Sequence, residues 1–164
     1  MQALFAIGRL ALVLIFIVSG ARKLYDIQGT AAAIAKEVPI PSVFASLVTQ
    51  IEAATGMTAP VLMAIATGVI ELGGGLMVAL NFGVSFAALI LFLLTAAATY
   101  YFHDFWNMAG EARMQNMISA QKNVAIMGGL LVFFVLGAFR PQPRSTRVEE
   151  FYPQPVRPED PRAP

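Results

Sequence analysis

Cysteine is absent from the 164 residues, and His103 is the single histidine. Without cysteine the chain has no dithiol chemistry, no thiolate ligands for an iron–sulfur cluster and no thioether attachment for haem. One histidine excludes a bis-histidine haem site within one chain and leaves too few nitrogen or sulfur ligands for zinc. We therefore expect no metal site and no intrinsic cofactor.

Charged residues are also scarce. Asp, Glu, Lys and Arg make up 13% of the chain, whereas hydrophobic residues make up 57% and the mean hydropathy is +0.68. A soluble domain usually has about 25% charged residues. The net charge of +1 gives no indication of nucleic-acid binding. This composition is typical of an integral membrane protein.

Four apolar segments are each close to the ~20 residues that a helix needs to cross a bilayer. They cover residues 3–21, 58–80, 83–101 and 123–139. Because backbone polar groups need partners in lipid, we expect helices, and the two-residue link Asn81-Phe82 predicts a tight antiparallel hairpin. The fold class is therefore an all-α membrane protein, an antiparallel bundle of four transmembrane helices within residues 1–140.

The first segment has an alternative interpretation as a signal peptide. Arg9 precedes the apolar residues 10–18, and the small residues Ser19-Gly20-Ala21 follow. No basic residue precedes Arg9, whereas a signal peptide begins with a charged region. We therefore favour a membrane span.

Two regions lie outside the spans. In the long connection of residues 22–56, apolar residues recur at helical spacing after Pro41-Ser42, which predicts a short helix at the membrane interface or capping the bundle. Residues 141–164 are rich in proline and arginine and predict an extended tail. The tail is either a solvated terminus or a docking strand for a partner, with Phe151-Tyr152 as its anchor.

Basic residues flank the spans on both sides of the membrane, so only the basic cluster of the tail indicates the orientation. Arg140, Arg144 and Arg147 lie close to the last span, and export of the tail would carry this cluster across the membrane. We expect both termini to be cytoplasmic.

Glu71 lies in the middle of the second span, where an unpaired carboxylate costs roughly 2.5–3.5 kcal/mol on insertion scales. If residues 3 and 80 mark the same face of the membrane, Arg9 lies about 9 Å deep and Glu71 about 13 Å deep. Gly68, Gly74 and Gly75 form a small-residue seam where another helix can approach. We therefore predict an Arg9–Glu71 pair, which either fixes helix register or handles protons or a ligand.

A second polar group is predicted at the opposite rim. Antiparallel order brings together the end of the first span, the end of the third and the start of the fourth. These ends supply Lys23, His103, Trp106 and Lys122. Aromatic walls with a few hydrogen-bond donors suit a quinone or a lipid headgroup, and an interfacial aromatic belt is the alternative.

The sequence resembles the DoxX family of small four-helix membrane proteins. The resemblance covers residues 8 to about 137, and its pieces occur in the family's order. They are Gly8-Arg9-Leu10, Phe16-Ile-Val-Ser-Gly20 with Lys23-Leu24, Gly29-Thr30, Pro39-Ile-Pro41, Val69-Ile-Glu71-Leu-Gly-Gly74, Phe102-His-Asp-Phe-Trp106 and Gln121-Lys-Asn123 with the glycines that follow. The stretch between Pro41 and Glu71 is longer than the family pattern, and the tail is additional.

The resemblance implies a subunit of a bacterial inner membrane associated with quinone-linked redox systems. One hypothesis is a non-catalytic accessory subunit that docks onto a larger membrane complex through the long first connection or the tail. The alternative is a quinone-binding oxidoreductase subunit in which the Arg9–Glu71 pair relays protons. A channel or transporter is disfavoured because four short helices with glycine-packed seams leave little lumen.

Overall fold

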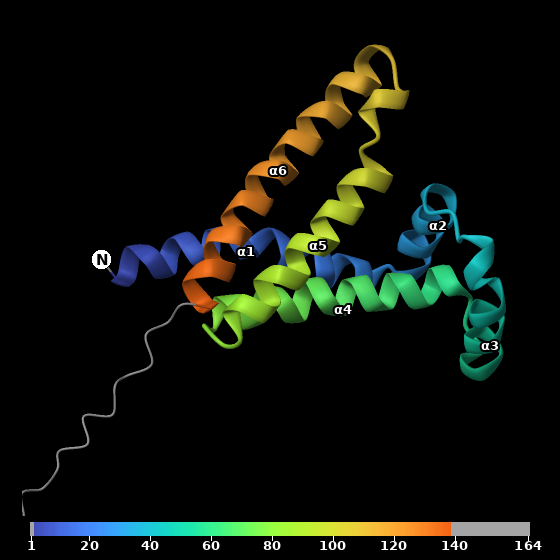
Figure 1. The fold of residues 1–164 in the computed structure, drawn as a ribbon, viewed down its shortest axis with the longest axis horizontal. Helices are drawn as coiled ribbons and strands as arrows, with labels where there is room; N and C mark the ends of the chain where they lie inside the picture. The colour runs from blue at the N-terminus through green and yellow to red at the C-terminus, as the bar shows by residue number, and fades with distance from the viewer. Residues whose placement is uncertain (1, 139–164) are drawn as a thin grey trace, which may run out of the picture.

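A computed structural model describes residues 2–138, and these residues form helices and no strand (Figure 1). The predicted tail of residues 141–164 lies outside the described residues. In chain order the elements are α1 (Gln2–Tyr25), α2 (Ile27–Glu37), η1 (Ser42–Phe44), α3 (Ala45–Thr55), α4 (Ala59–Ala79), α5 (Val84–Phe102), η2 (Phe105–Asn107) and α6 (Gly110–Ala138).

Four of these helices, α1, α4, α5 and α6, are long and apolar enough to cross a membrane. The predicted boundaries of α4 and α5 agree with the structure to within one residue. Helix α6 begins at Gly110, thirteen residues before the predicted start at 123. Its first turns carry polar residues such as Glu111, Arg113 and Gln115, so hydropathy identified only the apolar remainder of the helix.

The four long helices associate chiefly as two pairs. Helices α1 and α4 lie side by side and run in opposite directions, and α5 and α6 form a hairpin (Figure 1). The turn between α4 and α5 uses Asn81 (φ 62°) and Gly83 (φ 56°), both in the left-handed region. From this turn the α5–α6 hairpin leans away from α4, so that the end carrying α2 is the more open one (Figure 1).

The main hydrophobic core lies near the α4–α5 turn, where all four long helices meet. Its most buried side chains are Val13 of α1, Val78 of α4, Leu91 of α5 and Leu130 of α6, each fully buried. Phe5 of α1 also packs on Phe133 of α6, with 5.5 Å between the ring centroids. This core holds the two helix pairs together near the turn.

A smaller core forms where α2 lies against α4. Ala31 and Ile34 of α2 bury Ala64 of α4 at this contact. Sequence reasoning missed α2, although its start carries a signal: the carboxylate of Asp26 accepts a hydrogen bond from Gly29 N at 2.9 Å and caps the helix. The open space between the two cores is the candidate site.

The short helix predicted in the first connection is present as η1 and α3. Glu52 of α3 accepts a hydrogen bond from the backbone nitrogen of Ala59 at 2.6 Å, which caps the first turn of α4. The exposed side chains Val43, Phe44 and Leu47 form an apolar surface on this segment.

Candidate functional site

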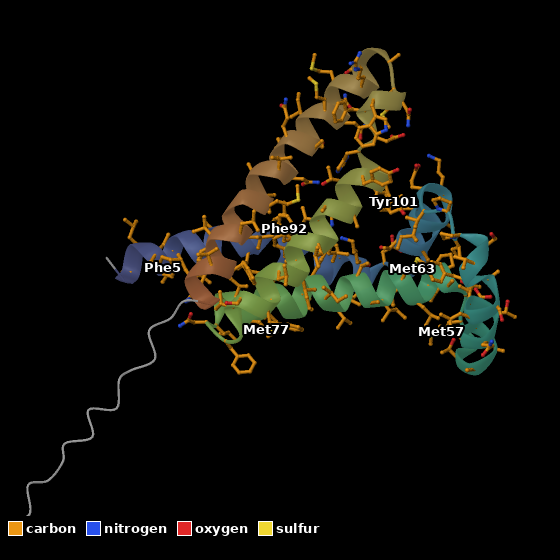
Figure 2. All side chains as sticks on the ribbon, in the orientation of Figure 1. Phe5, Met57, Met63, Met77, Phe92 and Tyr101 are labelled. Carbon is orange, nitrogen blue, oxygen red and sulfur yellow. The ribbon has the colours of Figure 1, made fainter. Side chains whose placement is uncertain are left out.

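A groove of about 1840 Å³ opens between α1, α2, α4 and α5, on the side where the two helix pairs diverge. Most of its wall is apolar. Met63 of α4 and Tyr101 of α5, both labelled in Figure 2, lie on different walls. The volume exceeds the ~300–1,000 Å³ of a typical small-molecule pocket, so the groove has room for a headgroup and part of an apolar tail.

An ion pair lies in the wall of this groove. Lys23 Nζ of α1 donates to Glu71 Oε2 of α4 at 2.6 Å, and to Ser19 Oγ at 2.7 Å. The Glu71 side chain is 10% exposed, whereas that of Lys23 is 28% exposed towards the groove. The carboxylate is thus held by a cation from the neighbouring helix, as a charge within a membrane span requires. A ligand in the groove can reach this ammonium group without first opening the helix pair.

The predicted pairing of Arg9 with Glu71 is corrected by this geometry. The Arg9 guanidinium lies 6.0 Å from the centre of the Phe5 ring, and its Nε is buried without a hydrogen-bond partner among the described residues. Glu71 is level with Gly20 of α1, and Arg9 is eleven residues earlier, about 16 Å away along the helix axis. The prediction assumed that the start of α1 and the end of α4 lie at the same depth. In the structure the first turns of α1 extend well beyond the end of α4 (Figure 1).

Glycines set this register, as the small-residue seam predicted. A Cβ atom on Gly20 would lie 2.7 Å from Gly68 O and would also meet the backbone nitrogen of Leu72. Gly75 is similarly covered by Ile17 of α1, whereas Gly74 faces Leu91 of α5. The close approach at Gly20 and Gly68 brings Lys23, less than one turn further along α1, over Glu71.

The structure divides the predicted rim group. Lys23 and His103 both line the groove, from α1 and from the end of α5. Trp106 and Lys122 do not line it. Trp106 is half exposed and packs on Tyr100, with 5.9 Å between the ring centroids, and Lys122 is exposed on α6.

Neutral hydrogen bonds link α5 to α6 beside the groove. His103 Nδ1 lies 3.0 Å from Asn116 Oδ1, and Asn123 Nδ2 donates to Thr99 Oγ1 at 2.9 Å. Sequence reasoning did not identify Asn116, because it lies before the apolar part of α6. Within residues 2–138 no three His, Cys, Asp or Glu side chains gather as metal ligands would. The ionisable side chains that line the groove include the cations Arg22 and Lys23, the carboxylates Asp26 and Glu71, and the imidazole of His103.

Comparison with known proteins agrees with this architecture. Residues 4–104, more than half of the chain, match the DoxX family. Inner membrane protein YphA of Escherichia coli (strain K12) is 31% identical over 134 residues, which cover 82% of this chain and 83% of the relative. No solved structure gives a significant match. The four apolar helices and the inner-membrane relative indicate a multi-pass inner membrane protein. By both the matched residues and this relative, the chain belongs to the DoxX family.

Proposed function

We propose that this protein is an inner-membrane subunit that binds the headgroup of a quinone in the groove, next to the Lys23–Glu71 pair. The observation that carries the proposal is the position of this pair: a charged donor in the wall of a large, mainly apolar groove that also contains His103. A quinone has a flat ring with carbonyl acceptors and an apolar tail. The ammonium group of Lys23 can donate to a carbonyl, and the aliphatic walls can cover the ring and the start of the tail.

In this proposal the proton-handling role that the sequence gave to Arg9 and Glu71 passes to Lys23 and Glu71. Ser19 holds Lys23 from its own helix, so the ammonium group remains at the groove wall when Glu71 rearranges. Glu71, buried and facing a cation, is the group that would accept a proton from a reduced headgroup. Electrons would go to or come from a redox partner.

The membrane arrangement that accompanies the proposal is an antiparallel bundle with α3 at the interface. The start of α1 and the end of α6 lie at the same end of the molecule, as an even number of crossings requires (Figure 1). The apolar surface of η1 and α3 would then contact the acyl region while the polar side chains of α3 face the headgroups. We place both termini in the cytoplasm, in keeping with the arginines after residue 138.

Calorimetric titration of the protein in nanodiscs with ubiquinone-1 tests quinone binding. We expect Lys23→Gln to weaken binding about tenfold, because it replaces a charge-assisted hydrogen bond with a neutral one. Lys122→Gln is the matched control, since that lysine is exposed outside the groove, and it should leave affinity unchanged. Equal affinity in the wild type and both variants would contradict the proposed site, and displacement of bound phospholipid without quinone uptake would assign the groove to lipid.

A second candidate function is that of an accessory subunit that docks onto a larger membrane complex. The exposed apolar surface of η1 and α3 favours it, with Val43 79%, Phe44 52% and Leu47 54% exposed. Purification in mild detergent should then yield a stoichiometric partner, and replacing these three residues with serine should release it. Retention of the partner by the serine variant would assign docking elsewhere, and the residues after 138 would be tested next.

A further inference from the structure

The amide of Asn116 has a defined orientation. Its nitrogen Nδ2 donates to the backbone carbonyl of Ala112, one turn earlier in α6, at 3.0 Å. The other side of the amide, the acceptor Oδ1, is therefore the atom that lies 3.0 Å from His103 Nδ1. An amide oxygen can only accept, so the imidazole must supply the hydrogen.

This contact decides which nitrogen of His103 carries the proton. With Nδ1 donating to Asn116, the neutral ring has its hydrogen on Nδ1 and an acceptor lone pair on Nε2. In the described part of the chain Nε2 has no hydrogen-bond partner, and His103 lines the groove. The ring therefore offers the groove a hydrogen-bond acceptor.

We infer that Asn116 is a positioning residue that fixes His103 as an acceptor, so that the groove prefers the hydroxyl-bearing, reduced form of a quinone headgroup. The inference rests on the proposed function for the identity of the ligand class. The protonation state of the His103 ring does not depend on the proposed function, because it follows from the two contacts of Asn116.

The preference follows from counting donors and acceptors. A hydroquinone hydroxyl both donates and accepts, so it can donate to His103 Nε2. A quinone carbonyl only accepts and would face the lone pair of Nε2 without a hydrogen between them. A site that presents an acceptor discriminates against a ligand without the matching donor, by roughly tenfold for one neutral hydrogen bond.

The state of the ring can be measured directly, because His103 is the one histidine of the chain. We would label the imidazole nitrogens with ¹⁵N, place the full-length protein in nanodiscs at mildly alkaline pH and record long-range ¹⁵N–¹H correlations without ligand. We expect a pyrrole-type signal from Nδ1 and a pyridine-type signal from Nε2. The reverse assignment, or two pyrrole-type nitrogens from a doubly protonated ring, would overturn the inference.

Two replacements of Asn116 separate positioning from folding. Asn116→Asp keeps an acceptor opposite Nδ1 and should retain the wild-type nitrogen signals, whereas Asn116→Leu removes the acceptor and should shift the ring towards the Nε2–H form. Asn123→Leu is the matched control: it removes a different side-chain link between α5 and α6 and should leave the His103 signals unchanged. Unchanged signals in Asn116→Leu, or the same shift in Asn123→Leu, would contradict the assigned role.

Ligand preference is measured separately, by titrating ubiquinol-1 and ubiquinone-1 into the same nanodiscs. The wild type and Asn116→Asp should bind the quinol about tenfold more tightly, and Asn116→Leu should lose this preference. Equal affinity for both forms in the wild type would overturn the inference while leaving the proposed function intact. Binding of neither form would overturn the proposed function and the ligand preference together, and the nitrogen signals would still decide the role of Asn116.

Discussion

The two helix pairs of this protein are held together by different chemistry. Helices α1 and α4 touch backbone to backbone at Gly20 and Gly68 and share one charged pair, Lys23 and Glu71. Helices α5 and α6 are joined by neutral links, including the Asn123–Thr99 hydrogen bond. In a membrane span an unpaired charge is far more costly than an unpaired amide, so the first pair should tolerate single replacements much less well than the second.

The largest effect is expected from Gly20→Leu. Even a Cβ atom at this position would overlap the backbone of α4, and backbone atoms cannot rotate away as a flexible side chain can. Separation of α1 from α4 should cost about 3 kcal/mol or more, or prevent folding. Reversible unfolding in mixed detergent micelles measures this cost. Gly8→Leu is the control, because a Cβ there meets no atom within 4 Å, and an equal loss in both variants would rule out the close contact as the cause.

A somewhat smaller effect is expected from breaking the ion pair. Lys23→Leu leaves the buried Glu71 carboxylate without its cation and should destabilise the protein by about 2–3 kcal/mol, discounted because the lysine is partly exposed. The double variant Lys23→Leu with Glu71→Leu should recover most of this loss in the same unfolding measurement. If the single and double variants are equally destabilised, the pair contributes through packing and the contrast with α5–α6 disappears.

Replacement of Asn123 by Leu tests the second pair. The variant removes one neutral hydrogen bond and leaves the Thr99 hydroxyl bonded to the backbone oxygen of Thr95 at 2.7 Å. We expect a loss of about 0.6–1 kcal/mol, measured under the same unfolding conditions. A loss as large as that of Lys23→Leu would show that the two helix pairs do not differ as proposed.

The smallest effect is expected from Arg9→Leu, which separates the structure from the sequence-based pairing. Arg9 contributes a cation near the Phe5 ring but no hydrogen bond to Glu71. Its loss should change the free energy of unfolding by no more than about 1 kcal/mol, with Arg9→Lys as the charge-preserving control. A loss of several kcal/mol that is reversed by adding Glu71→Leu would support the sequence-based pairing of Arg9 with Glu71.

Much of the fold could be predicted from the sequence because it depends on local composition. An apolar run of about 20 residues needs a helix in lipid whatever its neighbours are, so the bounds of α4 and α5 were correct to within one residue. The small-residue face at Gly68, Gly74 and Gly75 was also legible, since helical periodicity puts these positions within reach of neighbouring helices. Helix α2 was missed because its burial depends on a contact with α4 that lies thirty residues away in the chain.

The candidate site shows the limit of this local information. By itself the sequence determined that a carboxylate at Glu71 needs a cation, because the cost of an unpaired charge in a span does not depend on the fold. Only the tertiary structure decided that the cation is Lys23, since a shift of α1 along α4 leaves the hydropathy of both helices unchanged. The same holds for His103, which shares the groove with Lys23 while Trp106 and Lys122 lie outside it. These residues come from different helices, so their division depends on how the helices pack together, which no single segment encodes.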